Sequence, residues 1–180
     1  MTGKIYVEAD LGNGLIQTRG GSADGFVLKL QGQTGGYLWS RDFGSVDSDF
    51  ARAVAVDSLG DAVVVGYAYA GIDFGGGTAD NAGSSDLFIV KYAGLDGRYL
   101  WSEAAGGGGP DSAEGVAVDQ NRNVFVTGGF ATNIVLSGIS LVAAIDAGIY
   151  VAKYDAAGAI QWAFAVSPET SGGGIGARGA

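Results

Sequence analysis

The sequence predicts an all-β fold, a β-propeller built of four-stranded antiparallel blades, on three observations. The chain repeats itself at a distance of 62 residues, since Asp-Gly-Phe-Val-Leu-Lys at 24–29 returns as Asp-Leu-Phe-Ile-Val-Lys at 86–91. A fixed period of this length is typical of one supersecondary unit stacked on copies of itself. No window free of glycine shows the spacing of apolar residues that a helix needs. The 34 Gly and only 2 Pro are spread through the chain, as expected for many tight turns between short strands.

Each complete repeat is predicted to contain four short strands. They cover residues 51–57, 61–69, 86–92 and 98–104 in the first complete repeat, and 113–119, 123–130, 148–154 and 159–165 in the second. The third strand of each repeat is a continuous apolar run, which indicates burial on both faces. Antiparallel sheets buried on both sides and repeated in tandem are the blades of a β-propeller. An up-and-down barrel is the alternative, but a barrel does not require an identity between repeats.

The turn between the first two strands of a repeat contains a glycine in one copy and not in the other. Gly60 lies in the tight turn at 57–61, where glycine supplies a positive φ. Arg122 takes the place of Gly60 in the next repeat. We therefore expect Asn121 or Asn123 to adopt the left-handed conformation there, because asparagine tolerates it better than other side chains do.

The chain is predicted to be a single repeat array of about three blades, one of them split between its ends. Residues 1–44 would form a partial blade that lacks its first strand, 45–106 and 107–166 two blades, and 167–180 the start of a further one. Known propellers close with at least four blades, and an unpaired sheet edge invites another chain. We therefore expect the C-terminal strand of one copy to complete the N-terminal blade of another, giving a closed ring or a filament.

Composition excludes several partners and chemistries. The net charge of −9 argues against nucleic acid, since a binder must neutralise phosphates with clustered Lys and Arg. No run approaches the ~20 apolar residues that span a bilayer, so we expect no membrane insertion. The absence of Cys and His excludes disulfides, thiolate and imidazole metal ligands, and catalysis that uses a His base. The first residues do not resemble a signal peptide, so we expect any export signal to lie outside this chain.

Four segments together carry a family resemblance. They are residues 54–67 (Val-Ala-Val-Asp-Ser-x-Gly-Asp-x-Val-Val-Val-Gly-Tyr), 73–77 (Asp-Phe-Gly-Gly-Gly), 86–92 (Asp-x-Phe-Ile-Val-Lys-Tyr) and 99–102 (Tyr-Leu-Trp-Ser). This combination resembles the bacterial SBBP-type β-propeller repeat over nearly the whole chain. The resemblance implies a repeat array that is extracellular or at the cell surface, with no assigned reaction and no catalytic residue to carry over. The chain departs from the pattern at residues 133–145, where an apolar segment replaces the glycine-rich one.

Side chains that recur in every repeat are interpreted as structural, because a repeat reproduces structure. The recurring lysines, Lys29, Lys91 and Lys153, could form a ring of ligand-binding ammonium groups, but a repeated structural ion pair or a solvated strand end is favoured. The recurring tryptophans, Trp39, Trp101 and Trp162, could stack on sugars, but packing between blades is favoured.

Carboxylates could support calcium binding or acid–base chemistry in a chain without His. A calcium loop needs about six oxygen ligands within a short segment, and no segment of this sequence offers them. We therefore predict no metal and no other cofactor. The spacing leaves a glycosidase-type pair of carboxylates open, but it singles out no such pair, and no catalytic residue is assigned.

The least repeated segment, residues 134–145, is the candidate interaction site, since function concentrates in loops that vary. We expect a long loop there between the second and third strands. Its candidate patch consists of Ile134, Val135, Leu136, Ile139, Leu141 and Val142. Two interpretations stay open. The segment is either an extra hairpin packed on its own blade or an exposed apolar patch that docks a partner or a second copy.

The predicted function is a non-enzymatic scaffold for structural assembly or protein–protein interaction that associates with itself. Other repeats of the same type, another surface protein or a glycan are the further partners considered. One alternative is a carbohydrate-binding, lectin-like propeller that uses aromatic and Asp or Asn side chains on loops that differ between repeats. A second alternative is a hydrolase or lyase with its site in the central channel of a propeller.

Overall fold

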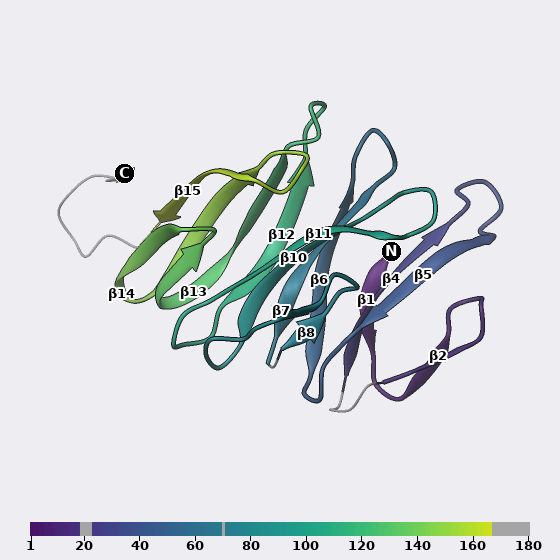
Figure 1. Ribbon diagram of the computed structural model, residues 1–180, viewed down its shortest axis with the longest axis horizontal. Coiled ribbons are helices and arrows are strands. Elements are labelled where there is room, and N and C mark those ends of the chain that lie inside the picture. Colours follow the sequence, from purple (N-terminus) through teal and green to yellow (C-terminus); the bar gives the residue numbers. More distant parts are fainter. Residues whose placement is uncertain (19–22, 70, 167–180) are drawn as a thin grey trace.

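The computed structural model of this chain describes residues 1–18, 23–69 and 71–166, which form strands and turns without a helix. Three larger antiparallel sheets follow one another along the molecule, as Figure 1 shows. Sheet 1 has three strands, and sheets 2 and 3 have four each. The all-β prediction is therefore confirmed, and so are four-stranded antiparallel sheets, while the described residues do not close into a ring.

The strands of the three sheets appear in chain order, and each sheet is a simple meander. Sheet 1 has the order β1 (Thr2–Ile5), β4 (Asp24–Leu30), β5 (Tyr37–Phe43). Sheet 2 consists of β6 (Asp49–Val56), β7 (Ala62–Ala68), β10 (Asp86–Tyr92) and β11 (Tyr99–Ala105). Sheet 3 consists of β12 (Ser112–Val118), β13 (Val124–Leu136), β14 (Ile139–Tyr154) and β15 (Ile160–Val166). The first strands β6 and β12 lie side by side.

Two small hairpins lie between neighbouring strands, one between β1 and β4 of sheet 1 and the other between β7 and β10 of sheet 2. One pairs β2 (Glu8–Asp10) with β3 (Leu15–Gln17), and the other pairs β8 (Ile72–Asp73) with β9 (Thr78–Ala79). The turns are alike, because Asp10 accepts hydrogen bonds from the backbone N–H groups of Gly12 and Gly14, and Asp73 accepts the same pair from Gly75 and Gly77. The aspartate in each hairpin therefore orders a glycine turn.

The hydrophobic core lies between the sheets, and sheet 2 contributes to both sides of it. Val64 and Val90 are fully buried against sheet 1, in a cluster with Val27. Val63 and Ile89 are fully buried on the opposite face, in a cluster with residues of sheet 3. Every residue of β10 is buried, which is why its sequence is a continuous apolar run.

The structure decides one expectation about local conformation and corrects another. Of the two interpretations of residues 134–145 the hairpin is confirmed, because β13 and β14 continue through them and pair Ile134 with Leu141. The two residues at its tip, Ser137 and Gly138, both have positive φ (42° and 89°), as the tightest hairpin turns require. In the earlier turn Arg122 itself is left-handed, with φ 66°. The left-handed backbone conformation found at Gly60 is kept at position 122, although a side chain other than glycine disfavours it.

The start of a further blade that the sequence predicts at residues 167–180 lies outside the described residues. Within the described ranges no helix is long and apolar enough to cross a membrane.

Candidate functional site

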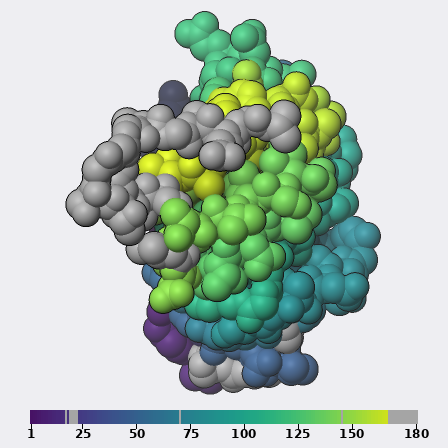
Figure 2. Space-filling view, turned by 90° about the vertical axis from the view of Figure 1, so that its left-hand side faces the viewer, coloured from purple at the N-terminus to yellow at the C-terminus, as the bar shows by residue number. Residues whose placement is uncertain are grey.

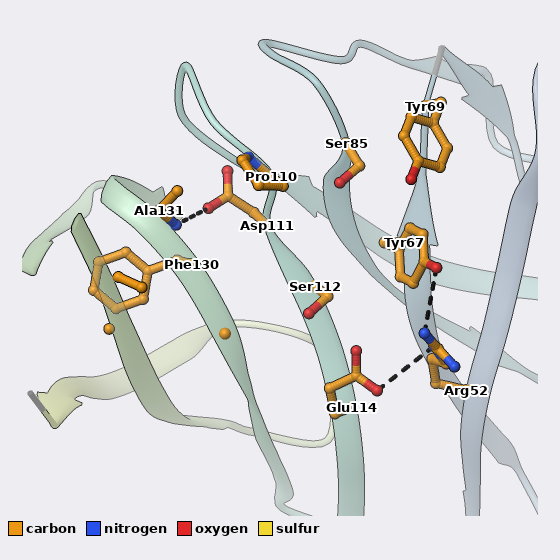
Figure 3. A pocket seen from close by; sticks show the side chains of 13 residues that line it. Arg52, Tyr67, Tyr69, Ser85, Pro110, Asp111, Ser112, Glu114, Phe130 and Ala131 are labelled. Atoms are coloured by element: carbon orange, nitrogen blue, oxygen red, sulfur yellow. Dashed lines mark hydrogen bonds and ion pairs between the residues drawn. The ribbon is translucent and has the colours of Figure 1, made fainter.

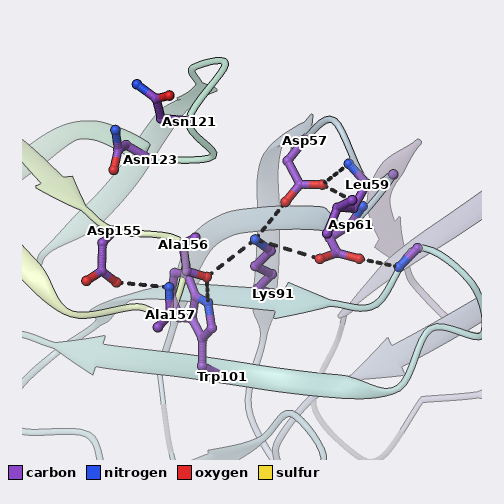
Figure 4. Close-up of polar contacts among 12 residues, drawn as sticks. Asp57, Leu59, Asp61, Lys91, Trp101, Asn121, Asn123, Asp155, Ala156 and Ala157 are labelled. Carbon is purple, nitrogen blue, oxygen red and sulfur yellow. Dashed lines mark hydrogen bonds and ion pairs between the residues drawn. The ribbon is translucent and has the colours of Figure 1, made fainter.

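The recurring lysine of sheet 2 lies inside the protein. Lys91 is 1% exposed, and its Nζ lies 2.8 Å from Asp57 Oδ2 and 3.8 Å from Asp61 Oδ2 (Figure 4). Burial acts to raise the pKa of Asp57, but hydrogen bonds from Lys91 and from the backbone N–H groups of Asp61 and Leu59 outweigh it, so that the pKa is lowered. Asp57 is therefore a charged partner that orders the turn after β6 and holds Lys91 in place.

The same lysine reaches the next sheet together with the recurring tryptophan. Lys91 Nζ and Trp101 Nε1 lie 3.5 Å and 3.3 Å from the carbonyl oxygen of Ala156, in the turn after β14 (Figure 4). The indole of Trp101 also stacks on Tyr154, with ring centroids 6.3 Å apart. These donors join sheet 2 to sheet 3.

The contact recurs one repeat earlier. Lys29 Nζ donates to the carbonyl oxygens of Gly94 at 2.7 Å and Gly60 at 3.1 Å, and Trp39 Nε1 donates to Gly94 at 3.0 Å. Lys29 thus binds carbonyl groups of sheet 2, whereas Lys91 also forms an ion pair with Asp57. In both repeats the lysine and the tryptophan join neighbouring sheets, which supports their structural interpretation.

An open cleft of about 420 Å³ lies where sheets 2 and 3 meet, along their first two strands. Arg52 crosses it from β6, with its Nε 3.5 Å from Glu114 Oε2 on β12 and its Nη2 3.3 Å from the Tyr67 hydroxyl (Figure 3). The guanidinium lies over the Tyr67 ring, 5.1 Å from its centroid. Because the Arg52 and Glu114 side chains are 44% and 50% exposed, both stay accessible to a ligand.

Aromatic rings line one wall of this cleft. The rings of Phe50 and Tyr67 stack with centroids 4.9 Å apart, and Tyr69 meets Tyr67 edge-on at 5.8 Å. Tyr69 is 44% exposed. Phe50 and Tyr69 also line a neighbouring hollow, together with Asp47 and Ser48. The cleft therefore combines an aromatic surface with one accessible pair of opposite charges.

The sequence reasoning missed this cleft, although the repeat carried a signal for it. Arg52, Tyr67 and Tyr69 of the cleft stand where the next repeat has Glu114, Gly129 and Ala131. The cleft is thus built from positions that differ between repeats, which is where the same reasoning placed function. Only the structure shows that these positions from two strands face one hollow.

A second carboxylate of the cleft, that of Asp111, accepts hydrogen bonds from the backbone. Asp111 is 1% exposed, and its Oδ2 accepts a hydrogen bond from the Gly107 N–H at 2.7 Å while its Oδ1 accepts one from the Ala131 N–H at 3.1 Å. Burial raises the pKa of Asp111. Because both oxygens hold loops in place, the arrangement shows no carboxylate positioned toward the open cleft for acid–base chemistry, apart from Glu114 in its ion pair.

The hairpin at 134–145 divides the candidate interaction patch between two faces. The structure buries Ile134, Leu136 and Leu141 (0%, 0% and 6% exposed) in the core between sheets 2 and 3, and Ile139 packs against them. Val135 and Val142 point the other way and are 45% and 70% exposed. At the tip the Ser137 hydroxyl donates to Glu103 Oε1 at 2.8 Å. The hairpin thus packs over β11 of sheet 2, and only two valines of the patch remain for docking, a role that stays a prediction.

No three or more carboxylates gather as a metal site in the described part of the chain. Calcium binding therefore gains no support from these residues.

Comparison with known proteins gives one informative similarity. The chain is 29% identical, over 156 residues, to an uncharacterized WD repeat-containing protein of Acanthamoeba polyphaga mimivirus, an alignment that covers 69% of this chain and 11% of the viral protein. No family model matches the chain, so the specific likeness to SBBP-type repeats gains no further support. WD repeats are β-propeller blades of four strands. The tandem antiparallel sheets and this similarity together indicate a repeat protein of the β-propeller type.

Proposed function

We propose that this chain is a non-enzymatic β-propeller-type scaffold that binds proteins, including further copies of itself, outside the cell or at its surface. The similarity to a WD repeat-containing protein supports an interaction scaffold in general. The location outside the cytoplasm rests on the resemblance to SBBP-type repeats. An export signal in the complete gene would support that location, and a complete gene without one would contradict it.

The observation that carries the self-association is the open edge of sheet 1. In sheets 2 and 3 the second strands, β7 and β13, are paired on both sides. The equivalent strand β1 is paired only with β4 among the described residues. An unpaired edge presents backbone donors and acceptors to another chain, and a strand from a second copy would complete the sheet.

The polar groups of the repeat support a scaffold over an enzyme. Lys29, Lys91 and the tryptophans beside them are used in contacts between sheets. Asp111 holds two backbone groups. These polar side chains are thus used in contacts within the protein that hold its strands and sheets in place.

Size-exclusion chromatography with light scattering tests the self-association. One chain has a mass of 18.0 kDa, and we expect the eluting species at micromolar concentration to have at least twice this mass and to grow with concentration. A folded species of single-chain mass over the whole range would contradict this part of the proposal.

The aromatic cleft favours carbohydrate binding as a second candidate. Phe50, Tyr67 and Tyr69 form an accessible aromatic surface beside Arg52 and Glu114, the combination of stacking rings and polar groups that sugar binding uses. The tryptophan first considered for stacking in sheet 1, Trp39, is 4% exposed. A glycan array should detect binding that is lost in Tyr69→Ala and kept in Tyr6→Ala, a tyrosine that is 59% exposed on sheet 1's side of the molecule. A blank array would rule this candidate out.

A further inference from the structure

The contact between neighbouring sheets has the same form each time it occurs. A tryptophan on the fourth strand donates to a backbone carbonyl in the turn after the third strand of the following sheet, from Trp39 to Gly94 and from Trp101 to Ala156. Gly94 and Ala156 are one repeat apart. The residue two positions before each acceptor, Tyr92 or Tyr154, is 1% or 0% exposed because the preceding sheet covers it.

Sheet 3 carries the donors of a third such contact on its outer face. Lys153 pairs across strands with Trp162, in the register that joins Lys29 with Trp39 and Lys91 with Trp101. No sheet follows β15 within the described residues, so the acceptor carbonyl is absent from this part of the chain. Figure 2 looks at this end of the molecule, where β14 and β15 face the viewer.

Apolar side chains surround Trp162 on that face. We define the end face as Phe125, Ile149, Val151, Trp162, Phe164 and Val166, which share one side of sheet 3 by cross-strand pairing. Ile149 and Val166 are 55% and 50% exposed, and the other four are half-buried.

In sheet 2 the positions equivalent to the end face are buried by the following sheet. The residues equivalent to Phe125, Ile149, Val151 and Val166 are Val63, Leu87, Ile89 and Ala105, and sheet 3 buries all four to 6% exposure or less. The end face is thus the side of a blade that the next blade would cover.

The opposite end of the molecule offers the complementary surface. The turn at 31–36 has the same hydrogen bonds as the turn at 93–98, because Gln31 and Ala93 each donate to the residue five positions on and each accept from the residue four positions on. Gly32 therefore stands where Gly94 stands, and it is exposed. Leu30 takes the place of Tyr92 and is 39% exposed.

The hairpin β2–β3 does not block this surface of sheet 1, because it is placed as the hairpin β8–β9 is placed on sheet 2. Its Gly12 lies against the ring of Tyr37, just as Gly76 of the β8–β9 turn lies against Tyr99. Sheet 1 docks on sheet 2 with the second hairpin in place, so the first hairpin does not prevent an equivalent docking on sheet 1.

We propose that the end face of one copy docks on sheet 1 of a second copy, head to tail, with Trp162 packed on the second copy's Leu30 and its Nε1 donating to the Gly32 carbonyl. The inference rests on the self-association in the proposed function and adds a contact between sheet faces to the strand pairing proposed at the edge of β1. It continues an interface that the chain already forms twice. Because the two surfaces differ, each copy keeps one open end, and the assembly grows until it closes as a ring or continues as a filament.

Charged substitutions on the two surfaces test the proposal. Ile149→Lys places an ammonium on the end face and Leu30→Lys places one on sheet 1, both at accessible positions that a monomer tolerates. Light scattering should show each variant at the mass of a single chain under conditions where the wild type is larger. Leu95→Lys is the matched control, since Leu95 is 93% exposed in the turn between β10 and β11, and its mass should equal that of the wild type.

Mixing the two variants gives a sharper result. Ile149→Lys keeps an intact sheet 1, and Leu30→Lys keeps an intact end face, so an equimolar mixture should form a species of two chains that grows no further. A mixture that stays at the mass of one chain would overturn the head-to-tail contact.

The remaining outcomes separate this inference from the proposed function. A wild type that stays at single-chain mass overturns both. If the wild type associates and Ile149→Lys associates equally well, only the docking of the end face is wrong. If instead a chain ending at Val166 loses association while Ile149→Lys keeps it, the contact runs through residues 167–180. Association lost in Val142→Lys and kept in Ile149→Lys would place it on the hairpin.

Discussion

The ammonium nitrogen of Lys91 lies 2.8 Å from Asp57 Oδ2, and the two side chains are 1% and 0% exposed. This pair joins the third strand of sheet 2 to the turn that follows its first strand. The same ammonium faces the Ala156 carbonyl of sheet 3. One buried charge therefore connects two strands of one sheet and, through that carbonyl, two sheets.

Removal of this ammonium should destabilise the fold. Lys91→Met leaves the Asp57 carboxylate buried without its partner, and we expect the free energy of unfolding to fall by about 3–5 kcal/mol. Urea denaturation measures the loss. Lys153→Met is the matched control in sheet 3, because Lys153 is half-buried over the Phe125 ring. We expect it to cost less than about 1 kcal/mol. Adding Asp57→Asn to Lys91→Met should recover part of the loss, and no recovery would mean that packing of the lysine stem dominates.

Stability should fall as pH rises from about 4 to about 6. Burial is the main cause that raises the pKa of Asp49 from 3.8 to about 6, against hydrogen bonds from Ser45. The folded chain then keeps a proton that the unfolded chain releases at lower pH, so unfolding releases that proton between these values. The shift corresponds to a loss of about 3 kcal/mol across this range.

Denaturation at pH 4.5 and pH 7.5, chosen to lie either side of about 6, measures this effect. Burial also raises the pKa of Asp86 and Glu103, which adds to the change in the same direction. Asp49→Asn should reduce the difference between the two conditions, and the exposed Asp146→Asn should leave it as in the wild type. Equal pH dependence in all three proteins would contradict the role of Asp49.

The three recurring tryptophans should differ in their effect on stability according to what covers them. Trp39 is 4% exposed between sheets 1 and 2, and Trp39→Ala should cost about 3–5 kcal/mol, as removal of a buried aromatic does. Trp101→Ala should lower the free energy of unfolding by the same amount or slightly less, because that ring is half-buried. Trp162→Ala should cost about 1 kcal/mol in a monomer, since no described sheet covers it. Urea melts of the monomeric Ile149→Lys background give the comparison, and equal costs for Trp39 and Trp162 would contradict it.

Glycine at position 122 should stabilise the chain. Arg122 has φ 66°, in the position where Gly60 has φ 80°. A left-handed residue other than glycine costs roughly 1–2 kcal/mol, and part of the gain is offset by the greater freedom of glycine in the unfolded chain. We expect Arg122→Gly to raise the free energy of unfolding by up to about 1 kcal/mol. Gly60→Ala should lower it by a similar amount, and a loss of stability in Arg122→Gly would show that the arginine side chain makes a stabilising contact.

The sequence by itself determined the strand content and the strand order of the repeat. The continuous apolar run at 86–92 predicted a strand buried on both faces, and β10 is that strand. The recurring Lys and Trp indicated a structural role, and in sheets 1 and 2 the structure uses both residues in contacts with the following sheet. These features could be predicted because they are local or periodic. Alternation, turn residues and repetition are properties of the residue order itself.

Only the tertiary structure decided how residues from different repeats meet. The sequence left residues 134–145 open between a packed hairpin and an exposed patch, because the packing of this segment on β11 depends on a neighbouring sheet that the local sequence does not describe. The cleft joins Arg52 of one sheet with Glu114 of the next, and the ring of Tyr67 in its wall stacks on Phe50 of the neighbouring strand. Whether Trp101 or Trp162 is covered depends on the presence of a following sheet, and the residues around each tryptophan do not encode that presence. Contacts between sheets bring together residues about one repeat apart, so they are fixed by the packing of whole sheets and not by the pattern within any one strand.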